Sequence, residues 1–118
     1  KLYIQNLIKK GEIELVWSYI LEYENSQNPF EERKIVILKW KSYSKVFVIE
    51  DEEIIDFINK IEDSGIKGQD AVHIACALKA KCDYFITTDH KLYRLSSSII
   101  KVVNPIEFIR LIEEENEN

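Results

Sequence analysis

The chain has 118 residues, 46% of them hydrophobic, and its 21 acidic and 16 basic side chains give a formal net charge of −5 at pH 7. This size and composition predict one globular domain, residues 1–118, with a single buried core. The acidic balance excludes a broadly basic nucleic-acid-binding surface, although it is compatible with a nuclease whose metal pocket is acidic.

No apolar run approaches the roughly 20 residues of a membrane span, and the chain has no signal-peptide pattern. The two cysteines, Cys76 and Cys82, are too few for a disulfide framework, so we expect a reduced, cytoplasmic chain. The chain begins with Lys1 rather than methionine, and we therefore expect the start of the natural protein to be missing.

Apolar periodicity, helix caps and β-branched runs predict a chain in which helices separate most of the strands. In chain order we expect a helix over 1–10, a strand over 12–17, helices over 18–27 and from 29 onward, a strand over 46–49, helices starting near 51 and 70, strands over 84–88 and 99–103, and a last helix over 105–113. The acidic segment 113–118 is expected to be a frayed, solvated tail.

Two segments carry the same signature of a helix start. Residues 28–31 (NPFE) and 104–107 (NPIE) each place asparagine as N-cap, proline at the first helical position and glutamate where it completes a capping box. The β-branched run 35–38 follows the first of them and is also compatible with a buried strand. The charged residues around that run and the cap before it favour a helix.

The predicted strands are short and apolar on both sides, and helices lie between most of them. This pattern predicts an α/β fold in which helices cover both faces of a parallel sheet. Four strands are few for so many helices, so we expect a central strand to be missing from this chain.

The segment 68–94 is the strongest candidate for a functional site. Asp70 stands at the front of its helix, and Asp89 follows the end of its strand. The buried face of the helix is predicted from the spacing i, i+3, i+4 and i+7 at Ala71, Ile74, Ala75 and Leu78. A carboxylate at a helix start and another at the carboxyl end of a strand converge in the crevice where open α/β sheets bind ligands.

The segments 70–75 (DAVHIA) and 82–89 (CDYFITTD) together resemble the carboxyl half of a PIN domain. Upstream, 18–24 (SYILEYE) resembles the second motif of that family, and 103–108 (VNPIEF) is similar to its usual last connection. The resemblance implies a three-layer α/β/α sandwich with a central parallel sheet and the activity of a metal-dependent nuclease, most often a ribonuclease.

The first strand of that family, which is central and ends in an acid, has no counterpart in this chain. The family's strand order places it between the predicted strands at 12–17 and 84–88. We therefore expect a gap there, which a strand from an upstream segment or from a neighbouring chain would fill.

Carried over by the resemblance, Glu24, Asp70 and Asp89 are the catalytic acids and hold Mg²⁺ or Mn²⁺, with Thr87 as a supporting hydroxyl. Glu22 is the competing choice for the acid on the second motif's helix. Hydrolysis of a phosphodiester requires an activated water and neutralisation of the phosphate charge, and hard cations held by carboxylates supply both. Taken alone, each acid has a simpler interpretation as a helix cap or as solvated surface.

Two further sets of polar residues lie near these acids. Lys91 and Arg94, one helical turn apart, are candidate RNA contacts, and ordinary surface charge is an equal alternative. A zinc site is not favoured, because no usual zinc spacing is matched by the set His73, Cys76, Cys82 and His90. We expect buried packing roles for that set.

The implied function is that of an endoribonuclease that hydrolyses RNA with Mg²⁺ or Mn²⁺, as the toxin of a toxin–antitoxin pair or as a stand-alone nuclease. Dimers and antitoxin complexes are common in the family, so the resemblance implies an antitoxin or a second copy as partner. The alternative is a non-catalytic PIN-like module that binds protein or RNA. The missing first acid favours the module, and the three retained acids favour the enzyme.

Overall fold

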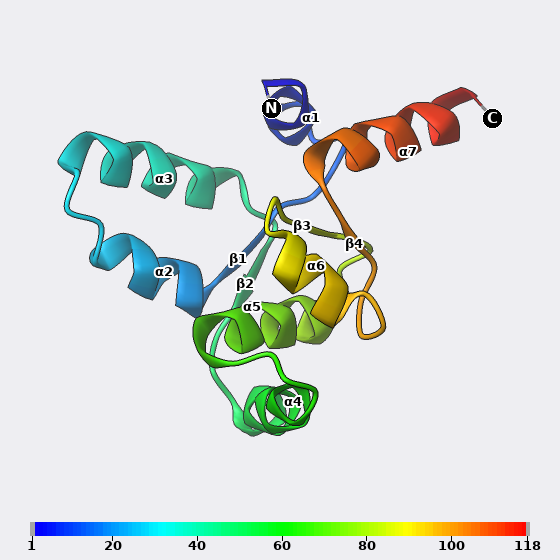
Figure 1. Ribbon diagram of the computed structural model, residues 1–118. Helices are drawn as coiled ribbons and strands as arrows, with labels where there is room; N and C mark the ends of the chain where they lie inside the picture. The colour runs from blue at the N-terminus through cyan, green and yellow to red at the C-terminus, as the bar shows by residue number, and fades with distance from the viewer. Residues whose placement is uncertain (1, 118) are drawn as a thin grey trace.

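The computed structural model describes residues 2–117, except the side chain of Glu117. Over this range seven helices and four short strands form a mixed α/β chain (Figure 1). In chain order the elements are α1 (Leu2–Lys9), β1 (Val16–Ser18), α2 (Tyr19–Ser26), α3 (Glu31–Tyr43), β2 (Val46–Val48), α4 (Glu52–Asp63), α5 (Gly68–Lys79), β3 (Phe85–Ile86), α6 (His90–Ser96), β4 (Val102–Val103) and α7 (Pro105–Glu117). The predicted domain also includes Lys1 and Asn118, which lie outside the described residues.

Several helices start at side chains that accept backbone N–H groups. Ser18 Oγ and Asp51 Oδ1 accept N–H groups from the first turns of α2 and α4, at 3.4 and 2.9 Å. At α7 the predicted capping box is formed: the Glu107 N–H donates to Asn104 Oδ1 (2.8 Å) and the Asn104 N–H donates to Glu107 Oε1 (3.3 Å). Each such bond satisfies a donor that has no partner within the helix.

At α3 the predicted capping box is wrong. Asn28 Oδ1 accepts the N–H of Phe30 at 3.0 Å, and Phe30 itself is extended (φ −102°, ψ 101°) and is the N-cap residue. The asparagine therefore closes a tight turn, and the helix begins only at Glu31. The run 35–38 is helical within α3, as predicted.

The predicted frayed tail at 113–118 is helical as far as the described chain extends, because α7 continues through Glu117. Its last turns also have a partner in another element: Tyr84 Oη donates to Glu115 Oε1 at 3.3 Å.

The four strands form two separate parallel pairs. β1 pairs with β2 in the register Val16–Val46, and β3 pairs with β4 in the register Phe85–Val102. Within residues 2–117 no ladder joins the two pairs, so β1 and β3 are not paired with each other, as expected for the strands predicted at 12–17 and 84–88. A single continuous sheet is not formed by these residues.

All four strands are shorter than predicted. β1 begins at Val16 rather than at residue 12, and β4 begins at Val102 rather than at residue 99. A strand continues only where a neighbour offers N–H and C=O groups, and each of these strands has a single short neighbour.

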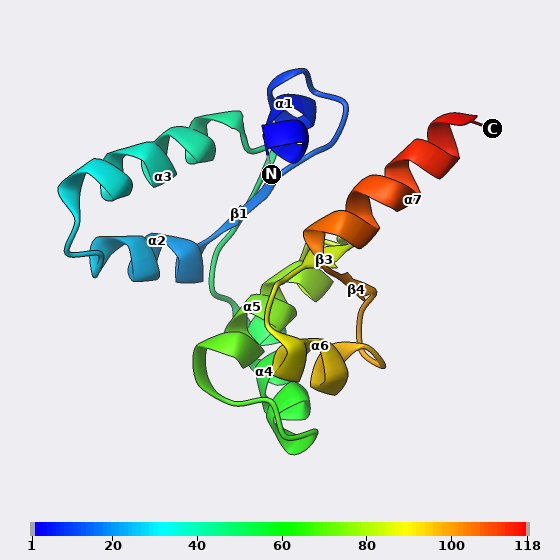
Figure 2. The ribbon, with the colours of Figure 1, turned by 45° about the horizontal axis from the view of Figure 1, so that its top comes forward.

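The helix α5 lies at the centre of the hydrophobic core. Its residues Ala71, Ile74 and Ala75 are fully buried, as their spacing predicted. Side chains from α4 and from both strand pairs belong to the same cluster, among them Ile54, Ile61, Val48 and Phe85. Figures 1 and 2 show α5 between α4 and the strands. The two strand pairs therefore share one core although no hydrogen bonds join them.

Candidate functional site

Asp70 and Asp89 line the same shallow pocket, which has a volume of about 160 Å³. Asp70 is the third residue of α5, whose N-cap is Lys67, and Asp89 follows β3. Both side chains are exposed. Two of the three predicted acids are thus brought together at the rim of the core, from elements far apart in the chain. The remaining wall is formed by Gly65, Ile66, Lys67, Lys91, Leu92 and Leu95.

Backbone amides hold the carboxylate of Asp89 in place. Asp89 is the N-cap of α6, and its Oδ1 accepts the N–H groups of Lys91 (2.9 Å) and Leu92 (3.1 Å). The N–H of Asp89 in turn donates to Thr87 Oγ1 at 3.1 Å. These bonds use one carboxylate oxygen for the helix start, and the other oxygen has no partner among the hydrogen bonds of the described chain.

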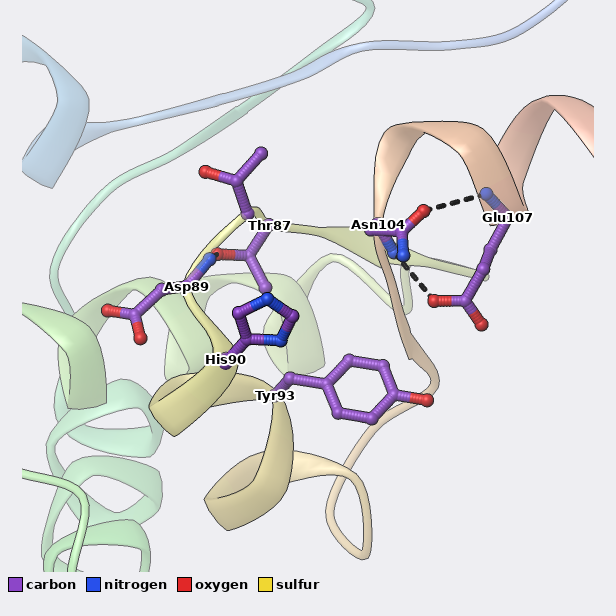
Figure 3. A pocket seen from close by; sticks show the side chains of 7 residues that line it. Thr87, Asp89, His90, Tyr93, Asn104 and Glu107 are labelled. Carbon is purple, nitrogen blue, oxygen red and sulfur yellow. Dashed lines mark hydrogen bonds between the residues drawn. The ribbon is translucent and has the colours of Figure 1, made fainter.

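A second pocket, of about 240 Å³, lies on the other side of Asp89 (Figure 3). Its wall includes Thr87, His90 and Tyr93, and the capping box of α7 closes the far side. The predicted supporting hydroxyl of Thr87 therefore lines this neighbouring pocket rather than the pocket that contains Asp70.

The third predicted acid, Glu24, lies in neither pocket. Its Oε1 is 2.9 Å from His73 Nε2, across 49 residues of sequence, and both side chains are partly buried. His73 lies one helical turn after Asp70 on α5, so this contact ties α2 to the helix that carries Asp70. From the sequence we expected only a packing role for His73. Its spacing of three residues from Asp70 was the available signal that both side chains lie on the same side of α5.

The competing acid, Glu22, has different partners from Glu24, on the other side of α2. It accepts a hydrogen bond from Trp17 Nε1 (3.0 Å) and forms an ion pair with Lys41 of α3. The hydrogen bond from Lys41, assisted by that from Trp17, holds the pKa of Glu22 below its usual value of 4.5. Of the two predicted basic contacts, Lys91 lines the pocket of Asp70 and Asp89, and Arg94 is exposed but lines neither pocket.

Buried packing was expected for the set His73, Cys76, Cys82 and His90. The expectation is confirmed at Cys76 and is wrong at His90, which is exposed and lines the second pocket. Cys76 is buried in the core face of α5, where burial raises its pKa to about 11, and His73 is bound to Glu24. Over residues 2–117 no three His, Cys, Asp or Glu side chains are grouped closely enough to hold a metal ion.

The two carboxylates are ligands of the chemical type that a hydrated divalent cation accepts. Mg²⁺ usually retains several waters and is held by only one or two carboxylates together with substrate phosphate. Asp70 and Asp89 offer such a pair of exposed oxygen ligands in one pocket.

Comparisons with protein-family models, with curated proteins and with solved structures found no match to this chain. Within the part of the chain that the structure describes, no helix combines the length and the apolar character needed to cross a membrane.

Proposed function

We propose that this chain is a PIN-type metal-dependent endoribonuclease domain. The observation that supports it is the shared pocket of Asp70 and Asp89, which lie at the two positions that the resemblance to PIN domains assigns to acids. One acid comes from the start of a helix packed at the centre of the core, and the other from the turn after a strand. This is the kind of crevice in which α/β proteins bind ligands.

In this proposal the carboxylates of Asp70 and Asp89 would hold Mg²⁺ or Mn²⁺, and the ion would supply an activated water and neutralise charge on the scissile phosphate. The backbone amides of α6 orient the Asp89 carboxylate before any ligand arrives. Lys91 lines the same pocket, where its ammonium group can donate to a phosphate oxygen of the RNA. The contact between Glu24 and His73 holds α2 against α5, the helix that carries Asp70.

The proposal includes the three-layer α/β/α arrangement of that family, completed by a strand between β1 and β3. Its support is the open edge of β3. The N–H groups of Phe85 and Thr87 donate to the carbonyls of Lys101 and Val103, so Ile86, between them, directs its own N–H and C=O away from β4. Within the described chain no strand pairs with that edge.

The biological setting follows from the resemblance alone. We include in the proposal a role as the toxin of a toxin–antitoxin pair that acts on cytoplasmic RNA, with an antitoxin as regulatory partner.

The substitution Asp70→Asn tests the proposed activity. It removes a charged ligand from the pocket but preserves the shape of the side chain, and the loss of helix-dipole stabilisation in the first turn of α5 is about 0.3–1 kcal/mol. We expect the variant to remain folded, to bind Mn²⁺ more weakly in calorimetric titrations, and to lose Mn²⁺-dependent cleavage of RNA.

The matched control is Asp56→Asn, which removes an exposed carboxylate from α4, away from both pockets. It should leave Mn²⁺ affinity and cleavage unchanged. Cleavage by folded Asp70→Asn at the rate of the unmodified protein would contradict the assignment.

The alternative function is a non-catalytic PIN-like module that binds protein or RNA. It is favoured by the engagement of both acids of α2, since Glu24 is bound to His73 and Glu22 to Lys41. The two functions predict different results: the module would bind RNA equally well with and without Mn²⁺ and would not cleave it.

A further inference from the structure

The pocket of about 240 Å³ beside Asp89 has two aromatic rings in its wall, and we call it the Tyr93 pocket. His90 and Tyr93 are three residues apart on α6, so their side chains lie on the same side of this helix. Figure 3 shows the two rings next to each other, across the pocket from Asn104 and Glu107. The ring of Tyr93 forms no aromatic pair within the described chain, so it is available to a ligand.

The wall opposite the rings offers a hydrogen-bond donor and an acceptor. The capping box uses Asn104 Oδ1 and Glu107 Oε1. Asn104 Nδ2 and Glu107 Oε2 have no partner among the hydrogen bonds of residues 2–117. Proteins hold an unpaired RNA base by stacking it on an aromatic side chain and by hydrogen bonds to its edge. The Tyr93 pocket contains both kinds of group.

Charge and size indicate which part of a nucleotide fits this pocket. The carboxylates of Asp89 and Glu107 both lie in the wall, so the pocket repels a phosphate, whereas a nucleobase is uncharged. Its volume of about 240 Å³ is also below the roughly 300–1,000 Å³ of typical small-molecule sites. The Tyr93 pocket therefore suits one ring system rather than a whole nucleotide.

The Tyr93 pocket adjoins the pocket that contains Asp70, because Asp89 lines both. A phosphate bound at Asp70 and Asp89 would have its attached nucleoside next to the Tyr93 pocket. The walls of this pocket come from α6 and from the residues that follow β3 and β4. The open edge of β3 faces away from β4, so the strand proposed between β1 and β3 leaves the pocket uncovered.

We propose that the Tyr93 pocket binds one unpaired base of the RNA strand whose phosphate binds at Asp70 and Asp89, with the base stacked on the ring of Tyr93. The inference rests on the proposed function for the position of the phosphate, and it adds a base subsite to that function. Every base has a face that can stack, so the subsite selects unpaired RNA rather than a particular sequence.

The test is a cycle that removes the ring and the base separately. A fluorescent single-stranded RNA is titrated with the chain in Ca²⁺, which takes the same oxygen ligands, and its dissociation constant is read from anisotropy. A series of the same RNA carries an abasic residue at one position at a time. We expect one such position to weaken binding about fivefold or more, and Tyr93→Leu to weaken binding of the intact RNA similarly. The two changes together should cost no more than either alone.

Two variants control for changes unrelated to stacking. Tyr93→Phe preserves the ring and should restore the affinity that Tyr93→Leu loses. Tyr23→Leu removes a ring that is 54% exposed on α2 and lines neither pocket, and it should leave the dissociation constant unchanged. The abasic series uses the unmodified chain, so it tests the inference even if Tyr93→Leu does not fold.

The inference is overturned if the unmodified chain does not bind the RNA, if no abasic position weakens binding, or if the two losses add in full. Adenosine monophosphate that bound as tightly as the RNA would indicate a site for a free nucleotide and would also overturn it. Cleavage of the same RNA in Mn²⁺ tests the proposed function separately. Base-dependent binding without cleavage would contradict the nuclease alone, and cleavage without base dependence would contradict the base subsite alone.

Discussion

Asp89 lies where β3 ends and α6 begins, and its carboxylate takes part in both the helix start and the pocket wall. One oxygen accepts two amide N–H groups of α6, and the side chain also lines the pocket with Asp70. Under the proposed function, removal of the side chain is therefore expected to change both the stability of the protein and its binding of a metal ion. The effects on stability and on metal binding can be separated by Asp89→Asn, because the asparagine side chain can cap a helix but carries no charge to attract a cation.

For this residue we predict that Asp89→Asn changes the free energy of unfolding by less than about 0.5 kcal/mol, since asparagine caps helices as well as aspartate does. Asp89→Ala should cost about 0.5–2 kcal/mol, because two amides of α6 lose their acceptor. Both variants should bind Mn²⁺ more weakly. Urea denaturation followed by circular dichroism and calorimetric Mn²⁺ titration measure the two effects. Equal stability of the two variants would show that the cap contributes nothing.

At the scale of elements, α2 is held on both sides by its glutamates. Glu24 contacts α5 through His73, and Glu22 contacts α3 through Lys41 and β1 through Trp17. These contacts lie on the solvated rim, since the side chains of both glutamates are 36% exposed. They orient α2, while the packing of α4 on α5 supplies the apolar core of the domain.

The lowered pKa of Glu22 leads to a pH-dependent stability. Because the folded-state pKa lies below the ordinary 4.5, the ion pair stabilises the fold fully above that value and loses its effect as the pH falls through the folded-state pKa. The effect of an exposed pair is on the order of 0.2–1 kcal/mol. We predict that Glu22→Gln is less stable than the unmodified chain near neutral pH and equally stable in acid, in urea denaturation at a series of pH values.

The partner variant Lys41→Gln provides the check on the cause of this pH dependence. It removes the largest influence on the pKa of Glu22, and most of the same pH-dependent contribution should disappear. If Lys41→Gln preserved the pH profile of the unmodified chain, the contribution would have to come from another carboxylate.

At the scale of the whole molecule, the described residues 2–117 contain two parallel strand pairs that share one core. An extended sheet edge with unpaired N–H and C=O groups is a site for pairing with a further strand. Ile86 at this edge of β3 is 37% exposed, so water pairs with the edge in the described chain. In the proposed three-layer arrangement, a strand between β1 and β3 would take the place of that water.

Hydrogen exchange tests this proposal at neighbouring amides. In the 118-residue chain alone, the amide of Ile86 should exchange much faster than those of Phe85 and Thr87, which donate to the β4 side at 2.9 Å. If a further strand paired with this edge as proposed, Ile86 should become protected to the same degree as these two neighbours. Equal, strong protection of Ile86 in the chain alone would show that no edge is open.

Much of the fold could be predicted because it depends on neighbouring residues. The Asn104–Glu107 capping box and the burial of Ala71, Ile74 and Ala75 on α5 involve groups a few residues apart, and both are confirmed. At Asn28 the same local signature was wrong, because the side chain reached the amide of Phe30 and closed a turn before the helix began.

The site was predictable only in part. Asp70 and Asp89 follow from positions at a helix start and a strand end, where fold class alone brings side chains to one rim. The engagement of Glu24 by His73 joins residues 49 positions apart, and no local pattern encodes it.

The sequence by itself thus determined six of the seven helices of the described chain, one of the two predicted capping boxes and the positions of two acids, because these depend on hydrogen bonds and spacings within one or two turns. The short helix α6 was not predicted. Only the tertiary structure decided the division of the strands into two pairs and the exposure of Ile35 and Val36 on α3. Both depend on which distant segments are present to pair or to pack. A strand or a helix face has the same local pattern whether or not its neighbour belongs to the chain.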